Sequence, residues 1–316
     1  MPPVVAEVVR SGFIESVHHG SVVALGPDGS ELWAVGEVHA PMFPRSSSKP
    51  MQAVGMMRAG LGSVITDPEQ LAVAAASHSG EPHHIALVRA ILAAGGLGPE
   101  ALDNTPTLPY DQAAAHDWIR SGGGPDRIHQ NCSGKHAAMV VTAQHNGWSI
   151  EGYRDPEHPL QKAIGAALAE LSGERAEHVG VDGCGAPLLS MTLTGVARSF
   201  SRMVQAPAGS AESAVADAMR GFPFAVGGTG REVTALMQSV PGLLAKDGAE
   251  GVYGAALPDG TAVAVKIADG AARAATPVLV AALRRLGVPA DQLDAVPASV
   301  VLGAGKPVGE VRAVAL

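Results

Sequence analysis

The chain has 316 residues, of which 47% are hydrophobic and 16% charged, so it can bury the core of one large domain or of two closely packed lobes. This composition excludes an intrinsically disordered chain. A net charge of −8 without a basic run, together with an aromatic content of 3%, argues against nucleic acid as the main partner.

Strands are predicted at both ends of the chain and helices between them. β-Branched runs over residues 4–9, 13–17, 21–25 and 32–38 predict strands, and a Gly-Pro-Asp-Gly turn at 26–29 predicts a hairpin. Apolar positions at helical spacing predict helices over 49–58, 82–94, 132–145, 159–171 and 212–220. Strands return at 251–257 and 261–267, and a covering helix follows at 276–286.

This order of elements indicates an α/β (α+β) fold in a single unit, 1–316. We expect one antiparallel sheet built from residues 1–45 and 240–316, with a helical lobe inserted at roughly 46–239. The N-terminus has no basic region followed by an apolar run, and no stretch of about 18 uncharged apolar residues occurs. Two cysteines in a chain of this length are not a disulfide framework. We therefore expect a cytoplasmic protein without a signal peptide or a membrane span.

Lysine is scarce, since the sequence has six lysines against sixteen arginines. Because Arg, Asp and Glu serve as the solubilising residues, each remaining lysine is a candidate for a specific role. Four lysines fall in Gly- or Ser-rich turns or at strand ends, namely Lys49, Lys135, Lys246 and Lys266, whereas Lys162 and Lys306 have the context of ordinary surface residues.

The segment Arg45-Ser-Ser-Ser-Lys-Pro-Met-Gln52 starts a predicted helix, with Pro50 in its first turn. Ser46 and Lys49 are three residues apart and share one face at the helix N-terminus, where amide groups and the helix dipole favour a nucleophile and a developing oxyanion. A neutral lysine can activate a serine when burial or other cations favour its uncharged form. The alternative is that the serines only cap the helix and Lys49 is solvated.

A second turn, Ser77-His-Ser-Gly-Glu81, also leads into a predicted helix. Its serines could be simple caps or could contribute hydroxyl groups to a site. We interpret His78, His83 and His84 as surface residues, because adjacent histidines on a helix point in different directions.

Both cysteines lie in glycine-bearing turns. Cys132 precedes Ser-Gly-Lys135-His at a helix N-terminus, where the dipole and a neighbouring lysine should lower the thiol pKa. Cys184 is flanked by glycines in Asp182-Gly-Cys-Gly-Ala-Pro. Two thiolates and a third donor could hold zinc, although the paired Cys-x-x-Cys spacing is absent.

Lys246 and Lys266 each lie near a strand end, close to an acidic residue and a glycine. Lys266 could equally lie on the solvated face of its strand. The loop Gly227-Gly-Thr-Gly-Arg231 could cradle an anion on its backbone amides, with Arg231 assisting.

Taken in order, the motifs Arg-Ser-x-x-Lys-Pro-x-Gln, Ser-His-Ser-Gly-Glu, Asn-Cys-Ser-Gly-Lys-His, Asp-Gly-Cys-Gly-x-Pro, Gly-Thr-Gly-Arg and Lys-x-Gly-Ala-Glu-Gly resemble the rhizobial-type L-asparaginase family. The resemblance extends from about residue 5 to about residue 310. It implies a fold similar to serine β-lactamases and glutaminases, a homodimer, and hydrolysis of L-asparagine to L-aspartate and ammonia through an acyl-enzyme.

The resemblance also implies roles for individual residues. Ser46 would be the nucleophile, Lys49 its base, and Ser77 with Lys266 a second serine–lysine pair, with Ser79 as the competing second serine. Zinc, one per subunit, would bind Cys132, Lys135 and Cys184. The candidate substrate-binding residues are Arg45, Asp182, Arg231, Lys246 and Glu250, among which Arg45, Arg231 or Lys246 could supply the cation for the substrate α-carboxylate.

Two other readings remain open at this level. The first is a different Ser–Lys acylase, such as a β-lactamase- or peptidase-like enzyme, which would share the Ser46 motif without requiring the cysteine turns. The second is a non-catalytic zinc-binding or thiol-sensing protein in which the serines are only caps. The sequence does not decide between asparagine and glutamine as substrates.

Overall fold

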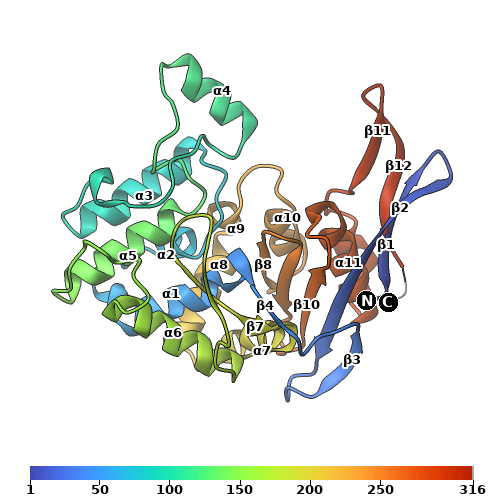
Figure 1. Cartoon of the computed structure of the whole chain (residues 1–316), viewed down its shortest axis with the longest axis horizontal. Helices are drawn as coiled ribbons and strands as arrows, with labels where there is room; N and C mark the ends of the chain where they lie inside the picture. The colour runs from blue at the N-terminus through green and yellow to red at the C-terminus, as the bar shows by residue number, and fades with distance from the viewer. Residues whose placement is uncertain (315–316) are drawn as a thin grey trace.

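The computed structural model describes residues 1–314, and an antiparallel sheet from both ends of the chain forms one side of it (Figure 1). The strand order is β11-β12-β1-β2-β10-β9-β8, and β3 pairs with β2 off this path. These strands are β1 (Val4–Arg10), β2 (Phe13–Leu25), β3 (Glu31–Val35), β8 (Leu244–Gly248), β9 (Val252–Ala256), β10 (Ala262–Ile267), β11 (Val300–Gly303) and β12 (Lys306–Ala313). The predicted α/β class with a sheet from both chain ends is confirmed.

The helices between these two groups of strands form the lobe opposite the sheet (Figure 1). They are α1 (Lys49–Arg58), α2 (Pro68–Ala74), α3 (Pro82–Ala94), α4 (Gln112–Arg120), α5 (Ser133–His145), α6 (Pro159–Ser172), α7 (Leu193–Val204), α8 (Ala211–Gly221), α9 (Pro223–Val226) and α10 (Glu232–Ser239). Helices α11 (Ala272–Arg285) and α12 (Ala290–Leu293) follow β10. Short elements in the connections are the 3₁₀ helices η1 (Arg45–Ser48), η2 (Leu61–Ser63) and η3 (Pro99–Ala101), and the small strand pairs β4 (Pro41–Met42) with β7 (Met191–Thr192) and β5 (Val179–Val181) with β6 (Pro187–Leu189).

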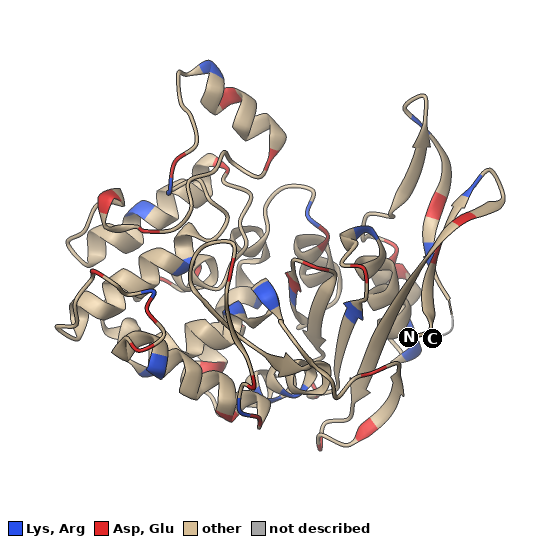
Figure 2. Cartoon of the chain, viewed as in Figure 1, with Lys and Arg blue, Asp and Glu red and all other residues tan. Residues whose placement is uncertain are grey.

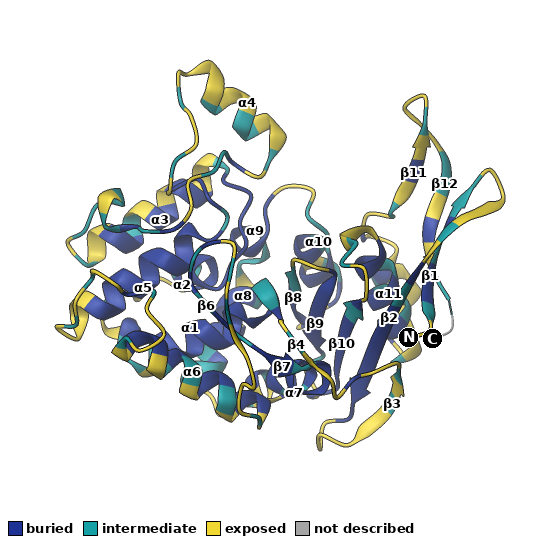
Figure 3. Cartoon of the chain, in the orientation of Figure 1, coloured by how far each residue is buried: buried dark blue, intermediate teal, exposed yellow. Residues whose placement is uncertain are grey.

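The central strands are covered on both faces. Gly254 of β9 faces α7, because a Cβ there would lie 2.4 Å from the Phe200 ring. The next residue towards the N-terminus, Tyr253, points to the opposite face and shares a pocket with Ala275 and Thr276 of α11. Figure 3 shows the result, with buried residues along the middle strands and the inner helices, and exposed residues on α4 and at the ends of the outer hairpins.

β2 is longer than predicted. The sequence predicts two strands, 13–17 and 21–25, whereas β2 runs without a break through His18, His19 and Gly20. Gly20 allows this because a Cβ would lie 2.6 Å from the Lys266 carbonyl oxygen of the neighbouring strand β10. β2 therefore pairs with β1 along its first part and with β10 along its second.

The charged residues are dispersed in the view of Figure 2, with basic side chains interspersed among acidic ones. Of residues 1–314, no helix is both long enough and apolar enough to cross a membrane.

Candidate active site

η1 and the first turn of α1 bring Ser46 and Lys49 together. The Lys49 backbone N–H donates to the Ser46 carbonyl, which closes a 3₁₀ turn over the three-residue spacing. Pro50 fixes the following backbone in the helical region at the start of α1. Lys49 is buried in this turn, whereas Ser46 is partly exposed and lines a pocket.

Arg45, which precedes Ser46, and Glu250, which follows Ala249 of the pocket, have strained backbones. Arg45 has φ of 52° and Glu250 has φ of 62°, in the left-handed region that non-glycine residues rarely adopt. Their side chains face each other, with Arg45 Nη1 3.6 Å from Glu250 Oε1. Such backbone strain persists where the surrounding structure holds a functional group in position.

The Lys49 amine is bonded to the Ser77 segment. Lys49 Nζ donates to the Ala76 carbonyl oxygen at 2.7 Å and to Ser77 Oγ at 2.9 Å, and Ser77 is itself buried. Two acceptors of the Ser77 segment therefore hold the buried Lys49 amine in place.

Ser79, the competing second serine, is used elsewhere. Its hydroxyl donates to the Gly227 carbonyl oxygen at 2.8 Å, which ties the turn to the loop before α10. The anion that this loop was expected to cradle is a side chain of the protein, because Glu81 accepts from the Thr229 backbone N–H and from its hydroxyl, both at 2.8 Å.

The interpretation of all three neighbouring histidines as surface residues is wrong for two of them. His78 and His84 are buried and stacked, with ring centroids 5.2 Å apart, and His84 stacks in turn on Phe224 at 5.1 Å. His83, one residue before His84, points outward to Glu69. Burial lowers the pKa of His84 and lowers that of His78 further, so both rings are neutral in the folded protein.

These two histidines predict a loss of stability in acid. Their folded pKa values lie below the unfolded value of about 6.5, so below that pH the unfolded chain binds more protons and the free energy of unfolding falls. Each ring is expected to add a slope of up to about 1.4 kcal/mol per pH unit. Urea unfolding between pH 5 and pH 8 measures this slope. In the His84→Gln variant the slope should be smaller by about the contribution of one ring. An unchanged slope in that variant would contradict the prediction.

The two cysteines and Lys135 meet at the N-terminus of α5. Lys135 Nζ donates to Cys184 Sγ at 3.3 Å, and Cys184 Sγ lies 3.7 Å from Asp182 Oδ2. Cys132 Sγ donates to Asn131 Oδ1 at 3.0 Å, and all three predicted zinc-site residues are buried.

The expected lowering of the Cys132 pKa is wrong, because the thiolate character lies on Cys184. The interaction with the Cys132 thiol and the charge of Lys135 lower the pKa of Cys184. The same thiol–thiol interaction, with burial, raises the pKa of Cys132. Burial disfavours the Lys135 charge, but the negative charge at the cysteines raises the pKa of this amine overall.

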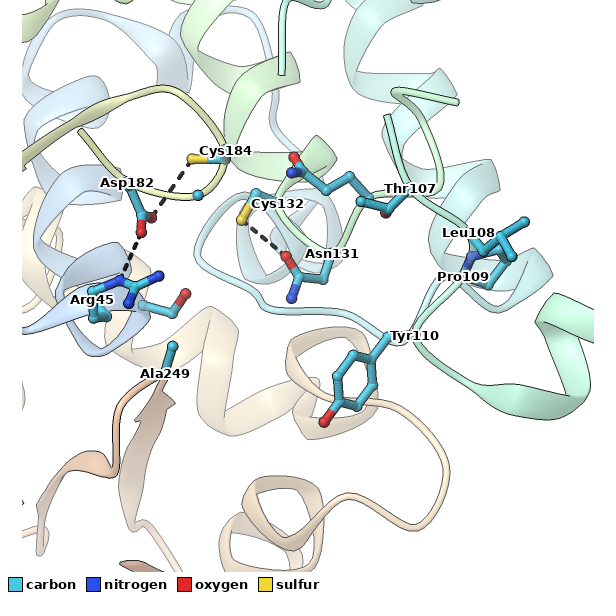
Figure 4. Close-up of a pocket in the computed structure, with 13 residues that line it drawn as sticks. Arg45, Thr107, Leu108, Pro109, Tyr110, Asn131, Cys132, Asp182, Cys184 and Ala249 are labelled. Carbon is cyan, nitrogen blue, oxygen red and sulfur yellow. Dashed lines mark hydrogen bonds and ion pairs between the residues drawn. The ribbon is translucent and has the colours of Figure 1, made fainter. Parts of the chain in front are cut away.

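Ser46 and both cysteines border one pocket of about 470 Å³, shown in Figure 4. It is lined by Arg45, Ser46, Thr107, Leu108, Pro109, Tyr110, Gln130, Asn131, Cys132, Asp182, Gly183, Cys184 and Ala249. Arg45 Nε donates to Asp182 Oδ1 at 2.8 Å across this pocket. Arg45 and Asp182, both predicted to bind substrate, therefore lie at the mouth of the same cavity as Ser46.

Lys266 lies outside this pocket. Its amine donates to the Glu250 carbonyl oxygen, and it borders a neighbouring cavity with Phe43, Arg45 and Glu250. The structure pairs Ser77 with Lys49 instead of Lys266, because Lys266 lies on β10 beyond β9 and β8 from the Ser77 segment. Glu250, another predicted substrate-binding residue, is likewise on the Lys266 side.

Lys246 on β8 is more deeply buried than Lys266, with none of its surface exposed. Burial lowers its pKa to about 8, Asp247 opposes this change, and the nearby positive charge of Lys49 adds to it. A Cβ on Gly248, two residues further along β8, would lie 2.8 Å from the Pro44 carbonyl oxygen, so β8 ends directly against η1.

Three residues of the site were not singled out from the sequence. Asp247 binds both Lys246 and Arg231, Tyr110 lines the pocket under the Arg231 guanidinium, and Ala249 faces Ser46 across the pocket. The acidic residue beside Lys246 was visible in the sequence, but no spacing signal distinguished it from a solvated aspartate. Tyr110 and Ala249 carry no sequence signal, because their positions follow from the packing of β8 and of the loop before α4.

The site thus combines a partly exposed serine, two buried lysine amines nearby and a pocket lined by both polar and apolar residues. The sequence model of the family described as L-asparaginase II matches residues 6–313. The chain belongs to the L-asparaginase II family.

Solved structures with a similar arrangement include a protein named Mglu in its native form, with 14% identity, a TM-score of 0.46 and coverage of 84% of this chain. The chain spans 63% of the length of that structure. A Bacillus glutaminase matches with 12% identity and a TM-score of 0.44, covering 78% of this chain and 83% of its own. A β-lactamase from Mycobacterium bovis matches with 13% identity and a TM-score of 0.39, covering 80% and 88%. The search of curated proteins found no match.

Proposed function

We propose that the protein hydrolyses the side-chain amide of L-asparagine to L-aspartate and ammonia through an acyl-enzyme on Ser46. The observation that carries this proposal is the buried Lys49 amine, which donates to Ser77 Oγ and lies in the same turn as Ser46, a partly exposed serine that lines the pocket. Family membership supports the choice of an amide as substrate.

In the first half of the reaction, Ser46 Oγ attacks the amide carbon while its proton passes to Lys49 Nζ. Two backbone donors can hold the oxyanion that forms. The N–H groups of Ser46 and Ala249 both belong to pocket-lining residues, and among residues 1–314 neither has a hydrogen-bond acceptor. The proton then moves through Ser77 to the leaving nitrogen, the C–N bond breaks, and ammonia departs.

In the second half, Lys49 takes a proton from a water molecule, which attacks the Ser46 ester. Lys49 then returns this proton to Ser46 Oγ as the ester C–O bond breaks and aspartate leaves. We assign the second lysine of the mechanism to Lys246 in place of Lys266. A positive charge on Lys246 favours a neutral Lys49, because two close ammonium groups repel. Asp182 at the pocket mouth is available to the substrate ammonium group, and Arg45 beside it is available to the carboxylate.

We further propose that zinc binds at Cys132, Lys135 and Cys184. Of the residues described, no three or more His, Cys, Asp and Glu side chains form a metal-binding group, so this donor set depends on the lysine amine. Two buried sulfurs and an amine are donors that zinc accepts, and the pocket leaves a further direction open. When bound, zinc supplies a positive charge that helps to orient the substrate. Lys135 must give up a proton to bind it, against its raised pKa.

Metal analysis of the purified protein tests this donor set without any activity measurement. We expect about one zinc per chain in the wild type and in Lys306→Met, and less than about a tenth of that in Cys132→Ser and Cys184→Ser. Full zinc content in both cysteine variants would contradict the assignment.

Paired assays of ammonia release from asparagine and glutamine, with a chromogenic β-lactam as a third substrate, test the reaction. Release from asparagine at a higher kcat/KM than from glutamine supports the proposal, and hydrolysis of the β-lactam alone would favour the other Ser–Lys acylase. The homodimer, also part of the proposal, is tested by light scattering of the same preparation.

Gly248 offers a test of the oxyanion donors. An alanine Cβ at this position would lie 2.8 Å from the Pro44 carbonyl oxygen and 3.0 Å from the Ser47 nitrogen, so β8 and η1 must separate. We expect kcat/KM for Gly248→Ala to fall by about 100-fold, because a displacement of about 1 Å in a catalytic group has this effect. Gly221→Ala is the matched control, since nothing lies within 4 Å of its Cβ, and it should keep wild-type activity. A Gly248→Ala variant as active as Gly221→Ala would contradict the expectation.

A further inference from the structure

The Asp247 carboxylate at the end of β8 is shared by two cations from different parts of the chain. Its Oδ1 accepts from Lys246 Nζ at 2.5 Å, and its Oδ2 accepts from Arg231 Nη2 at 2.8 Å. Lys246 Nζ also donates to the Asp247 carbonyl oxygen at 2.8 Å. One residue therefore fixes the Lys246 amine by two contacts and joins β8 to the start of α10.

Arg231 carries this connection on to the serine segment. Its Nη1 donates to the Ser77 carbonyl oxygen at 3.2 Å, so Asp247, Arg231 and Ser77 form one bonded series. The same guanidinium stacks over the Tyr110 ring at 4.7 Å, and Tyr110 lines the pocket that holds Ser46.

We propose that Asp247 is a positioning residue of the reaction: it holds Lys246 Nζ at the site and, through Arg231, holds the Ser77 segment against Lys49. This inference rests on the proposed function, and it goes beyond it by assigning a role to a residue that contacts neither the pocket nor a metal ligand.

The charges around Lys246 allow the role of Asp247 to be measured. Lys246 is faced by Asp247 on its own strand, by Lys49 of α1 and by Arg231 before α10. Tyr253 of β9 lies within the field of Asp247 and of Glu232 on α10. Burial alone would raise the pKa of Asp247, but Lys246 and Arg231 hold it below its ordinary value, so the carboxylate stays charged.

Opposite substitutions should therefore move the Lys246 pKa in opposite directions. Asp247 raises this pKa and Arg231 lowers it. In Asp247→Asn the pKa of Lys246 should fall from about 8, and in Arg231→Gln it should rise. If the charged Lys246 is the active form, the alkaline limb of kcat/KM moves to lower pH in Asp247→Asn and to higher pH in Arg231→Gln. If Asp247 only stabilised the fold, its loss would lower kcat/KM at every pH and leave the pH of the alkaline limb unchanged.

A titration by NMR of ¹³Cε-labelled lysine measures the same quantity without turnover, because the chain has only six lysines to assign. We expect the resonance that disappears in Lys246→Met to titrate near pH 8 in the wild type and about one unit lower in Asp247→Asn. Asp247→Glu, which keeps the charge, should restore most of the difference. Asp117→Asn, on an exposed helix, should leave the titration unchanged.

The two readouts separate the possible failures. If the wild type releases no ammonia from asparagine but the Lys246 resonance shifts as expected, the proposed function fails and the positioning role stands. If Ser46-dependent activity is present and neither the resonance nor the alkaline limb moves in Asp247→Asn, the positioning role is overturned. If Asp247→Asn does not fold, Arg231→Gln decides in its place, and an unmoved Lys246 titration there overturns the proposal.

Discussion

Replacing Ser46 with alanine is expected to reduce ammonia release from asparagine by about 10³-fold or more, because the nucleophile that carries the acyl group is removed. Ser46 is partly exposed and makes no side-chain hydrogen bond within residues 1–314, so the variant should fold with wild-type stability. Steady-state ammonia assays and urea unfolding measure both quantities.

Ser47→Ala is the matched comparison. Ser47 is buried and donates to the Pro44 carbonyl oxygen at 2.7 Å, so its loss should cost stability and only a small part of the rate. Ammonia release that persists in Ser46→Ala would remove Ser46 as the nucleophile, and activity lost in Ser47→Ala alone would move the assignment to the neighbouring serine.

Lys246→Met and Lys266→Met should differ strongly. Loss of Lys246 is expected to reduce kcat/KM by about 10²- to 10³-fold, in the range of a lost general acid or base. Loss of Lys266 should change it by less than about threefold, because this partly exposed amine contacts the Glu250 carbonyl oxygen in a cavity beside the site.

Methionine keeps the length of the buried side chain, so the Lys246 variant loses the charge and little of the packing. The same assays at pH 7 with Lys162→Met as a surface control measure the contrast. A larger loss in Lys266→Met than in Lys246→Met would reinstate the pairing of Ser77 with Lys266 that the sequence predicts.

Local sequence signals were sufficient to place the helices whose first turn contains a proline. A proline in the first turn marks the starts of α1 and α3, and both predicted helices, 49–58 and 82–94, have the bounds that the structure gives. The break predicted between residues 17 and 21 does not exist. His18 and His19 interrupt the pattern of β-branched residues, but both pair with β1 across a register shift between Val4 and Ala6.

The two lysines near strand ends could not be ranked from the sequence. Lys246 and Lys266 have similar neighbours, an acidic residue and a glycine, and β8 is a five-residue strand with two charged residues, which has no apolar period to reveal its burial. Which lysine lies at the site is decided by strand order, since β8 packs on η1 and β10 lies two strands away. The roles of Ser46, Ser77 and the zinc-site residues remain predictions.

The pairing of the two chain ends has a consequence for how the protein is made. β1 and β2 pair with each other, but β1 also pairs with β12 from Ala6 to Arg10 and β2 with β10, so these two pairings form only after most of the chain has left the ribosome. Sequence-distant pairing of this kind slows folding. Val314 N–H donates to the Val5 carbonyl oxygen at 2.8 Å, so a short linker could join the two ends of the chain, and new ends could open at the exposed turn after α4 (Figure 3), giving a circular permutant in which these strands are contiguous. Such a permutant should refold faster than the natural order while keeping the same site.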